Sequence, residues 1–162
     1  MMKKSIRVLV ILALAAIVAC NPTTQPEQQN PGDFAADFSN TDGTPSFFDA
    51  TNAKAFVIGS MYTVSGTQST LSGTADLTVA GIPSSSSVPY TVTSQQSSTL
   101  KVSYHDPTNN KDYFSTSGGG SCTVSISQTS QTLLGTFTAR LIATGADSVR
   151  QVTSASFNAT IQ

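Results

Sequence analysis

Apolar and polar side chains alternate with a period of two along most of the chain beyond residue 33. In the segments 122–126, 133–141 and 157–161, every second residue is apolar or glycine, and most residues between them are Ser, Thr, Asn or Arg. A strand with this alternation places one face against a core and the other in water. That arrangement is typical of antiparallel sheets, so the pattern predicts an all-β fold.

Clusters of Gly, Pro, Asn, Asp and Ser interrupt the alternation at short intervals, as turns do. We expect strands near residues 34–38, 54–65, 70–80, 88–93, 99–105, 112–116, 121–128, 133–144 and 149–161. One helical turn is expected at Ala50–Ala55. Eight or nine short strands predict an antiparallel β-sandwich, with a flattened barrel as the alternative because the sequence does not give the strand pairing.

The first twenty residues carry a different pattern. Lys3, Lys4 and Arg7 precede an apolar run over residues 8–19, and Cys20 follows the run. Twelve residues are too few to cross a bilayer as a helix, so the segment is interpreted as an export signal peptide. The motif Ile17-Val18-Ala19-Cys20 resembles the lipobox of bacterial lipoprotein precursors. The resemblance implies that Cys20 is acylated, with palmitate-type chains, and becomes the first residue of the mature protein.

This interpretation divides the chain into three parts. Residues 1–19 form the signal peptide, residues 20–33 form the lipidated cysteine with a flexible linker, and residues 34–162 form the β-sandwich domain. The linker contains three prolines and no large apolar residue, and about 13 residues near polyproline geometry reach roughly 40 Å. Asn21 rather than Asp follows Cys20, and by the enterobacterial sorting pattern the resemblance implies the outer membrane.

The charged residues limit the partners. Eight Lys or Arg and nine Asp or Glu give the chain a net charge of −1, and three of the basic residues lie in the predicted signal peptide. The remaining five are scattered, so no basic stripe exists to neutralise nucleic-acid phosphates. With 24 Ser, 23 Thr and no Trp, the exposed faces depend on hydroxyl groups for solubility. The expected partners are the membrane, through the lipid on Cys20, and an envelope protein or a glycan.

Candidate chemical groups are few. His105 is the only histidine and is expected in an exposed turn, without the serine and carboxylate geometry that nucleophilic catalysis needs. Cys122 is expected to be a buried thiol without a disulfide partner if Cys20 carries lipid. Calcium needs six to eight oxygen ligands, and one loop offers a weak set: Asp106, Asn109, Asn110 and Asp112. The favoured interpretation of that loop is a hairpin turn, so no metal or other cofactor is expected.

Aspartates and aromatic residues are two further groups of candidates. The aspartates of the N-terminal region are interpreted as solvated turn residues: Asp33, Asp37, Asp42 and Asp49. Eight aromatic residues are candidates for a ligand surface, although core packing is the default expectation. They are Phe47, Phe48, Phe56, Tyr62, Tyr90, Tyr104, Tyr113 and Phe114. The loop Gly118–Gly120 lacks the lysine and helix of a phosphate-binding loop.

Three stretches of the mature domain resemble a group of small, uncharacterised Bacteroidota-type envelope lipoproteins. They are the segment 34–53 with its Asp42-Gly43 turn, the strand pair around 135–139 and 154–159, and the linker after Cys20. The resemblance implies an all-β fold and supplies no catalytic residues. We therefore expect a non-enzymatic module with a structural or protein-interaction role. The alternative is a glycan- or small-ligand-binding module, and a hydrolase is the remote alternative.

Overall fold

The computed structural model describes residues 30–40, 45–85, 87–145 and 148–162. Every regular element in these ranges is a strand, which confirms the predicted all-β class. The strands are β1 (Phe34–Asn40), β2 (Pro45–Ala50), β3 (Lys54–Ile58), β4 (Met61–Thr70), β5 (Gly73–Pro83), β6 (Tyr90–Thr93), β7 (Lys101–Asp106), β8 (Lys111–Phe114), β9 (Ser121–Thr129), β10 (Thr132–Ala143) and β11 (Val149–Ile161). The predicted signal peptide and Cys20 lie outside the described residues.

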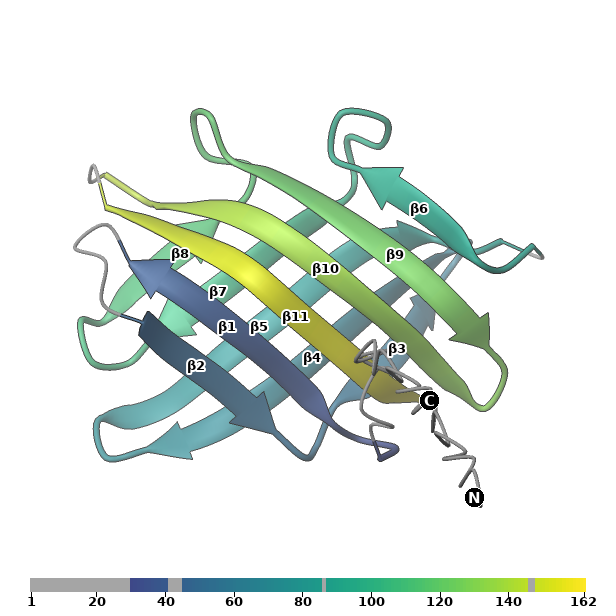
Figure 1. Cartoon of the computed structure of the whole chain (residues 1–162), viewed down its shortest axis with the longest axis horizontal. Coiled ribbons are helices and arrows are strands. Elements are labelled where there is room, and N and C mark those ends of the chain that lie inside the picture. The colour runs from purple at the N-terminus through teal and green to yellow at the C-terminus, as the bar shows by residue number, and fades with distance from the viewer. Residues whose placement is uncertain (1–29, 41–44, 86, 146–147) are drawn as a thin grey trace, which may run out of the picture.

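The strands form one continuous sheet that folds over into two layers (Figure 1). The front layer has the order β2-β1-β11-β10-β9-β6, and the back layer has the order β3-β4-β5-β7-β8. In Figure 1 the strands of one layer cross those of the other steeply. Two corners join the layers, because the end of β11 pairs with the start of β3 and the end of β10 pairs with β8. The fold thus combines the two layers of a sandwich with the partial closure of a flattened barrel.

The core lies between the two layers and follows from the period of two. In β10, every second residue from Leu133 to Leu141 is buried, as the alternation predicts. Phe34 lies at the centre, with its ring 5.6 Å from the ring of Phe48 and 5.9 Å from those of Phe137 and Phe157, all in edge-on geometry. Such edge-on aromatic pairs add about 0.5–1.5 kcal/mol each to the gain from burial.

Gly135 makes this aromatic packing possible. A Cβ atom at this position would lie 2.7 Å from the Phe157 ring and 2.8 Å from the carbonyl oxygen of Ser125 on β9. Because both contacts are shorter than real Cβ contacts, a larger residue would push the ring or the neighbouring strand away. The glycine therefore allows β10 to lie directly over the ring.

The segment 45–55 differs from the prediction in two ways. β2 was not expected, although Phe48 and Ala50 alternate with Phe47 and Asp49 and are buried. The predicted helical turn at Ala50–Ala55 is wrong, because the backbone is extended there: the N–H of Ala53 donates to the carbonyl of Gly32 at 2.7 Å. Pairing of β2 with β1 over six residues outweighs the weak local preference for a turn of helix.

Strand number and direction also differ from the expectation. The predicted strand over 54–65 is two strands, because Gly59 at φ +62° turns the chain between β3 and β4. Together with β2 this raises the number of strands from the expected eight or nine to eleven in the described residues. One pairing is parallel rather than antiparallel, since Thr160 and Ile161 of β11 lie beside Lys54 and Ala55 of β3.

The residues just before β1 are already part of the domain. The N–H of Gly32 donates to the carbonyl of Asn158 at 2.6 Å, and the N–H of Asn158 donates to the carbonyl of Asp33 at 2.9 Å. The sequence placed residues 30–33 in the linker, whereas here they close one end of the β1–β11 pair. In the part of the chain that the structure describes, no helix is long and apolar enough to cross a membrane.

Candidate functional site on the outer face of the front layer

The outer face of the front layer extends over six strands. Its side chains come from the polar positions of the alternation, so Ser and Thr dominate it. One direct cross-strand row runs through all six strands, and we call it the hydroxyl row. It consists of Asp49, Ala35, Ser156, Thr136, Ser125 and Thr91, on β2, β1, β11, β10, β9 and β6. Side chains directly opposite each other in such pairs have Cβ atoms about 4.5–5.5 Å apart, so the row presents closely spaced hydroxyl groups.

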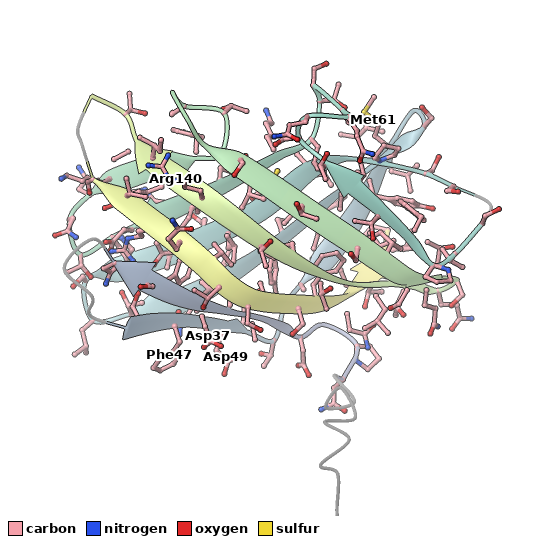
Figure 2. All side chains as sticks on the ribbon, turned by 45° about the horizontal axis from the view of Figure 1, so that its top comes forward. Asp37, Phe47, Asp49, Met61 and Arg140 are labelled. Atoms are coloured by element: carbon pink, nitrogen blue, oxygen red, sulfur yellow. The ribbon has the colours of Figure 1, made fainter. Side chains whose placement is uncertain are left out.

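At the β2 end of this face, an aromatic ring is exposed between two carboxylates. Phe47 is 71% exposed, and it lies directly opposite Asp37 on β1. Asp49 lies two residues further along β2, on the same face and opposite Ala35. Figure 2 shows Asp37, Phe47 and Asp49 together on the outer side of β1 and β2. We call these three residues the Phe47 site.

The floor of the Phe47 site is hollow because small residues form it. Ala35, Ser154 and Ser156 line a shallow depression of about 250 Å³ together with the three larger side chains. A volume of this size is below the range of pockets that enclose a small molecule. The depression therefore suits the edge of a larger partner that lies over the sheet rather than a ligand buried within it.

The carboxylates of the Phe47 site have no ionic partner among the residues that the structure describes. Both are exposed, so water solvates them in the free protein. A partner that covered the site would need a positive charge or hydrogen-bond donors to replace that water, since leaving a carboxylate buried and unpaired costs several kcal/mol.

A second set of aromatic and charged groups lies at one end of the core, between the layers. Arg150 is buried there, and one of its NH2 groups donates to the carboxylate of Asp106. Its guanidinium carbon lies 5.9, 5.3 and 5.0 Å from the ring centres of Phe38, Tyr104 and Tyr113. We call these five residues the Arg150 cluster. Burial raises the pKa of Tyr104, an effect that the charge of Arg150 partly offsets.

The two carboxylates of the weak calcium set have different partners. The carboxylate of Asp106 accepts hydrogen bonds from the N–H of Thr108 at 2.9 Å and the side-chain amide of Asn109 at 3.0 Å, in addition to its pair with Arg150. Asp112 instead lies 2.7 Å from Nδ1 of His105. In the described residues no three acidic, His or Cys side chains are grouped as metal ligands would be. The loop instead uses Asp106 to fix its own backbone.

His105 lies within β7 rather than in a turn. Its direct cross-strand neighbours are Asp76 on β5 and Asp112 on β8, so the imidazole stands between two acidic residues on the outer face of the back layer. No serine or cysteine lies directly opposite it, because both neighbouring positions are aspartates. The arrangement supports an ion pair when the imidazole is protonated.

Cys122 is a buried free thiol, as the alternation predicted. Burial raises the pKa of this thiol, although weak hydrogen bonds from Ser115 and Ser94 act in the opposite direction. A thiol with a raised pKa is a poor nucleophile near neutral pH. Cys122 therefore behaves as a small apolar core residue.

The aromatic and acidic candidates divide between core and surface. Phe48, Tyr104 and Tyr113 are buried. Phe47 is the most exposed of the eight aromatic candidates. Asp37 and Asp49 lie on strands rather than in turns, and Asp42 lies outside the described residues. Without β2, the sequence pattern gave no connection between the rings and the aspartates. The alternation of the apolar residues Phe48 and Ala50 with Phe47 and Asp49 was the signal that could have predicted β2. It would have placed Phe47 and Asp49 on the same face of that strand.

The glycine loop is tied to the sheet. Nη1 of Arg140 donates to the carbonyl of Gly119 at 2.6 Å. Figure 2 labels Arg140 on β10.

No protein-family model, no curated protein and no solved structure matches the chain.

Proposed function

We propose that the chain is a lipid-anchored envelope protein whose β-sandwich is a non-enzymatic interaction module. The signal peptide pattern and the Ile17-Val18-Ala19-Cys20 motif support the anchor, and Asn21 favours the outer membrane. The Phe47 site supports the interaction role. It is the single observation that carries the proposal, because it combines on one sheet face a ring that is 71% exposed, two exposed carboxylates without an ionic partner in the described residues, and a shallow depression.

The chemistry of the site favours a protein partner with a basic segment. Aromatic residues are enriched among the residues that contribute most to binding at protein interfaces. Asp37 and Asp49 flank the ring and have no ionic partner in the described part of the chain, so Lys or Arg side chains of a partner complement them. The shallow floor leaves room for such side chains beside the ring.

A glycan is the second candidate, favoured by a different feature of the same surface. Carboxylates and the hydroxyl row offer many hydrogen-bonding groups, and an exposed ring offers an apolar face for a sugar ring. Phe47→Trp distinguishes the two candidates. The larger flat ring of tryptophan is expected to strengthen binding of neutral oligosaccharides several-fold. A shape-complementary interface with a protein partner is expected to lose affinity, because the larger side chain no longer fits.

The anchor is tested on the protein purified from membranes. We expect the mature chain to begin at Cys20 and to carry fatty acids by mass spectrometry, and Cys20→Ser to appear in the soluble fraction. Stable anchoring needs two lipid signals, since a single short acyl chain binds only marginally. A mature chain without fatty acid, or one that begins elsewhere, contradicts the anchor.

The interaction role is tested separately. Phe47→Ala is expected to weaken partner capture at least tenfold while the fold is retained. Leu71→Ala is the matched control, since Leu71 is also exposed and apolar but lies in the turn between β4 and β5. Equal capture by both variants contradicts the interaction role of the Phe47 site.

A further inference from the structure

Three consecutive apolar side chains of β3 are exposed. Phe56 is 42%, Val57 49% and Ile58 69% exposed. Other large apolar residues that are exposed in the described parts of the chain, namely Phe47, Leu71 and Val88, stand singly in the sequence. Phe56 and Ile58 lie on one face of the strand and Val57 lies on the other, so the end of β3 exposes apolar side chains on both of its faces. Such a concentration of exposed apolar side chains marks a surface that is covered in use.

The pairing of β3 leaves the end of the strand at a free edge of the sheet. All five residues of β3 pair with β4 on one edge of the strand. On the other edge of β3, β11 pairs only with Lys54 and Ala55. In the described part of the chain, Phe56–Ile58 therefore has a strand on one side only. Free edges of natural sheets are usually protected by charge, proline or a bulge, and this edge carries Phe-Val-Ile instead.

The chain enters the domain beside β3. The carbonyl of Gly32 accepts the N–H of Ala53, the residue immediately before β3. At about 3.3 Å per residue of strand, Phe56 to Ile58 lie roughly 10–17 Å from that point. Residues 21–29 separate Cys20 from the first described residue, and ten residue steps near polyproline geometry span about 31 Å. A lipid on Cys20 is therefore held within reach of the exposed strip.

We propose that Phe56–Ile58 contacts the surface of the bilayer that holds the lipid of Cys20, and so orients the domain. The inference rests on the proposed lipid anchor and goes beyond it. The contact lies at the level of the head groups, because the backbone of a free edge needs water or head groups as hydrogen-bond partners. Lys54, exposed at the start of the same strand, adds attraction to anionic head groups.

The proposed orientation leaves the candidate site accessible. Met61 pairs with Ile58 across the β3–β4 turn. Figure 2 places Met61 on the opposite side of the view from Asp37, Phe47 and Asp49. With the β3–β4 turn against the membrane, the Phe47 site is directed away from it and toward a partner.

The absence of Trp from the chain allows a direct test. Ile58→Trp and, as matched control, Leu71→Trp are each placed in the full-length lipidated protein. The protein is reconstituted in vesicles of neutral and anionic phospholipids, and bromine on the upper part of the acyl chains quenches a tryptophan that contacts them. We expect at least threefold stronger quenching of Trp at position 58 than at position 71. Val57→Trp repeats the test if Ile58→Trp does not fold.

The remaining outcomes separate this inference from the anchor. Equal quenching at both positions, in a protein that is acylated and floats with the vesicles, overturns the membrane contact and leaves the proposed function standing. Emission at position 58 that is shifted to the blue yet insensitive to bromine means that a second copy or a partner strand covers β3, which also overturns it. A protein that is neither acylated nor bound to vesicles overturns both proposals.

Discussion

The Arg150 cluster and the Phe47 site share two kinds of side chain and differ in burial and in the presence of a basic partner. Each combines aromatic rings with aspartate. In the Arg150 cluster the rings of Phe38, Tyr104 and Tyr113 and the carboxylate of Asp106 surround one buried guanidinium. In the Phe47 site, ring and carboxylates are exposed on a sheet face. The carboxylate and the terminal NH2 groups of the first set are hydrogen-bonded within the fold, with only Nε of the Arg150 guanidinium left without a partner in the described residues, whereas the second set is available to a binding partner.

The largest expected effect comes from breaking the Arg150 cluster. Asp106→Ala leaves a buried guanidinium without its carboxylate, so the free energy of unfolding should fall by about 3–5 kcal/mol. Urea unfolding followed by circular dichroism measures it. The exposed Asp112→Asn is the control and should cost less than about 0.5 kcal/mol. A loss below about 1 kcal/mol for Asp106→Ala contradicts a structural role for the cluster.

Adjacent phenylalanines sharpen the comparison. Phe48 is buried beside Phe34, whereas Phe47 points outward from the same strand. Phe48→Ala should lower the free energy of unfolding by about 3–5 kcal/mol through the cavity it leaves. Phe47→Ala should change it by less than about 0.5 kcal/mol. Similar losses for the two variants would show that Phe47 is part of the packing and not a contact residue.

An apolar replacement of the buried pair should recover most of the loss. Asp106→Leu combined with Arg150→Met removes both charges, so no unpaired charge remains between the layers. We expect this double variant to unfold within about 1–2 kcal/mol of the native protein, since the loop still loses the hydrogen bonds from Thr108 and Asn109 to Asp106. The same urea titration measures the free energy of unfolding of the double variant. A double variant that is no more stable than Asp106→Ala would contradict the role of the unpaired charge.

The smallest expected effect is on the alkaline pH dependence. Because burial raises the pKa of Tyr104 in the folded protein, its phenol stays protonated at a pH where the unfolded chain has begun to ionise. The contribution of the protonated Tyr104 phenol to stability is complete below about pH 10, the usual pKa of tyrosine. It is lost as the pH rises through the pKa that Tyr104 has in the folded protein. Tyr104→Phe should therefore flatten the decline of stability above pH 10.

Cys122 requires a control in that experiment. The pKa of its thiol is also raised by burial, so it produces a decline of the same sign that begins near pH 9. The pH dependence of stability with and without Tyr104→Phe is therefore measured in protein that also carries Cys122→Ala. An unchanged slope above pH 10 would mean that burial does not keep the phenol of Tyr104 neutral.

The sequence predicted the core strands better than the two polar sites. Alternation located the buried residues of β9 and β10, from Cys122 to Ile126 and from Leu133 to Leu141, because each strand carries its own pattern. Arg150 and Asp106 are 44 residues apart and meet only through the two-layer packing. No local pattern could indicate that pair, and Asp106 was assigned to a loop instead.

The candidate site was partly within reach of the sequence. Phe47 was among the aromatic candidates, but Asp37 and Asp49 were interpreted as turn residues. Without β2, no register connected them. The helical turn expected at Ala50–Ala55 failed for a similar reason, since hydrogen bonds to residues distant in the sequence hold that segment extended: the N–H of Thr67 donates to Asn52, and that of Ala53 to Gly32.

Cross-linking from the face of β2 tests the interaction role most directly. A photoreactive phenylalanine analogue is introduced at position 47 or, as control, at position 71, and intact cells that produce the protein are irradiated. We predict one discrete adduct from position 47, at least five times more abundant than any adduct from position 71, and its loss when Asp37 and Asp49 are both changed to Asn. Equal, diffuse adducts from the two positions would contradict the account.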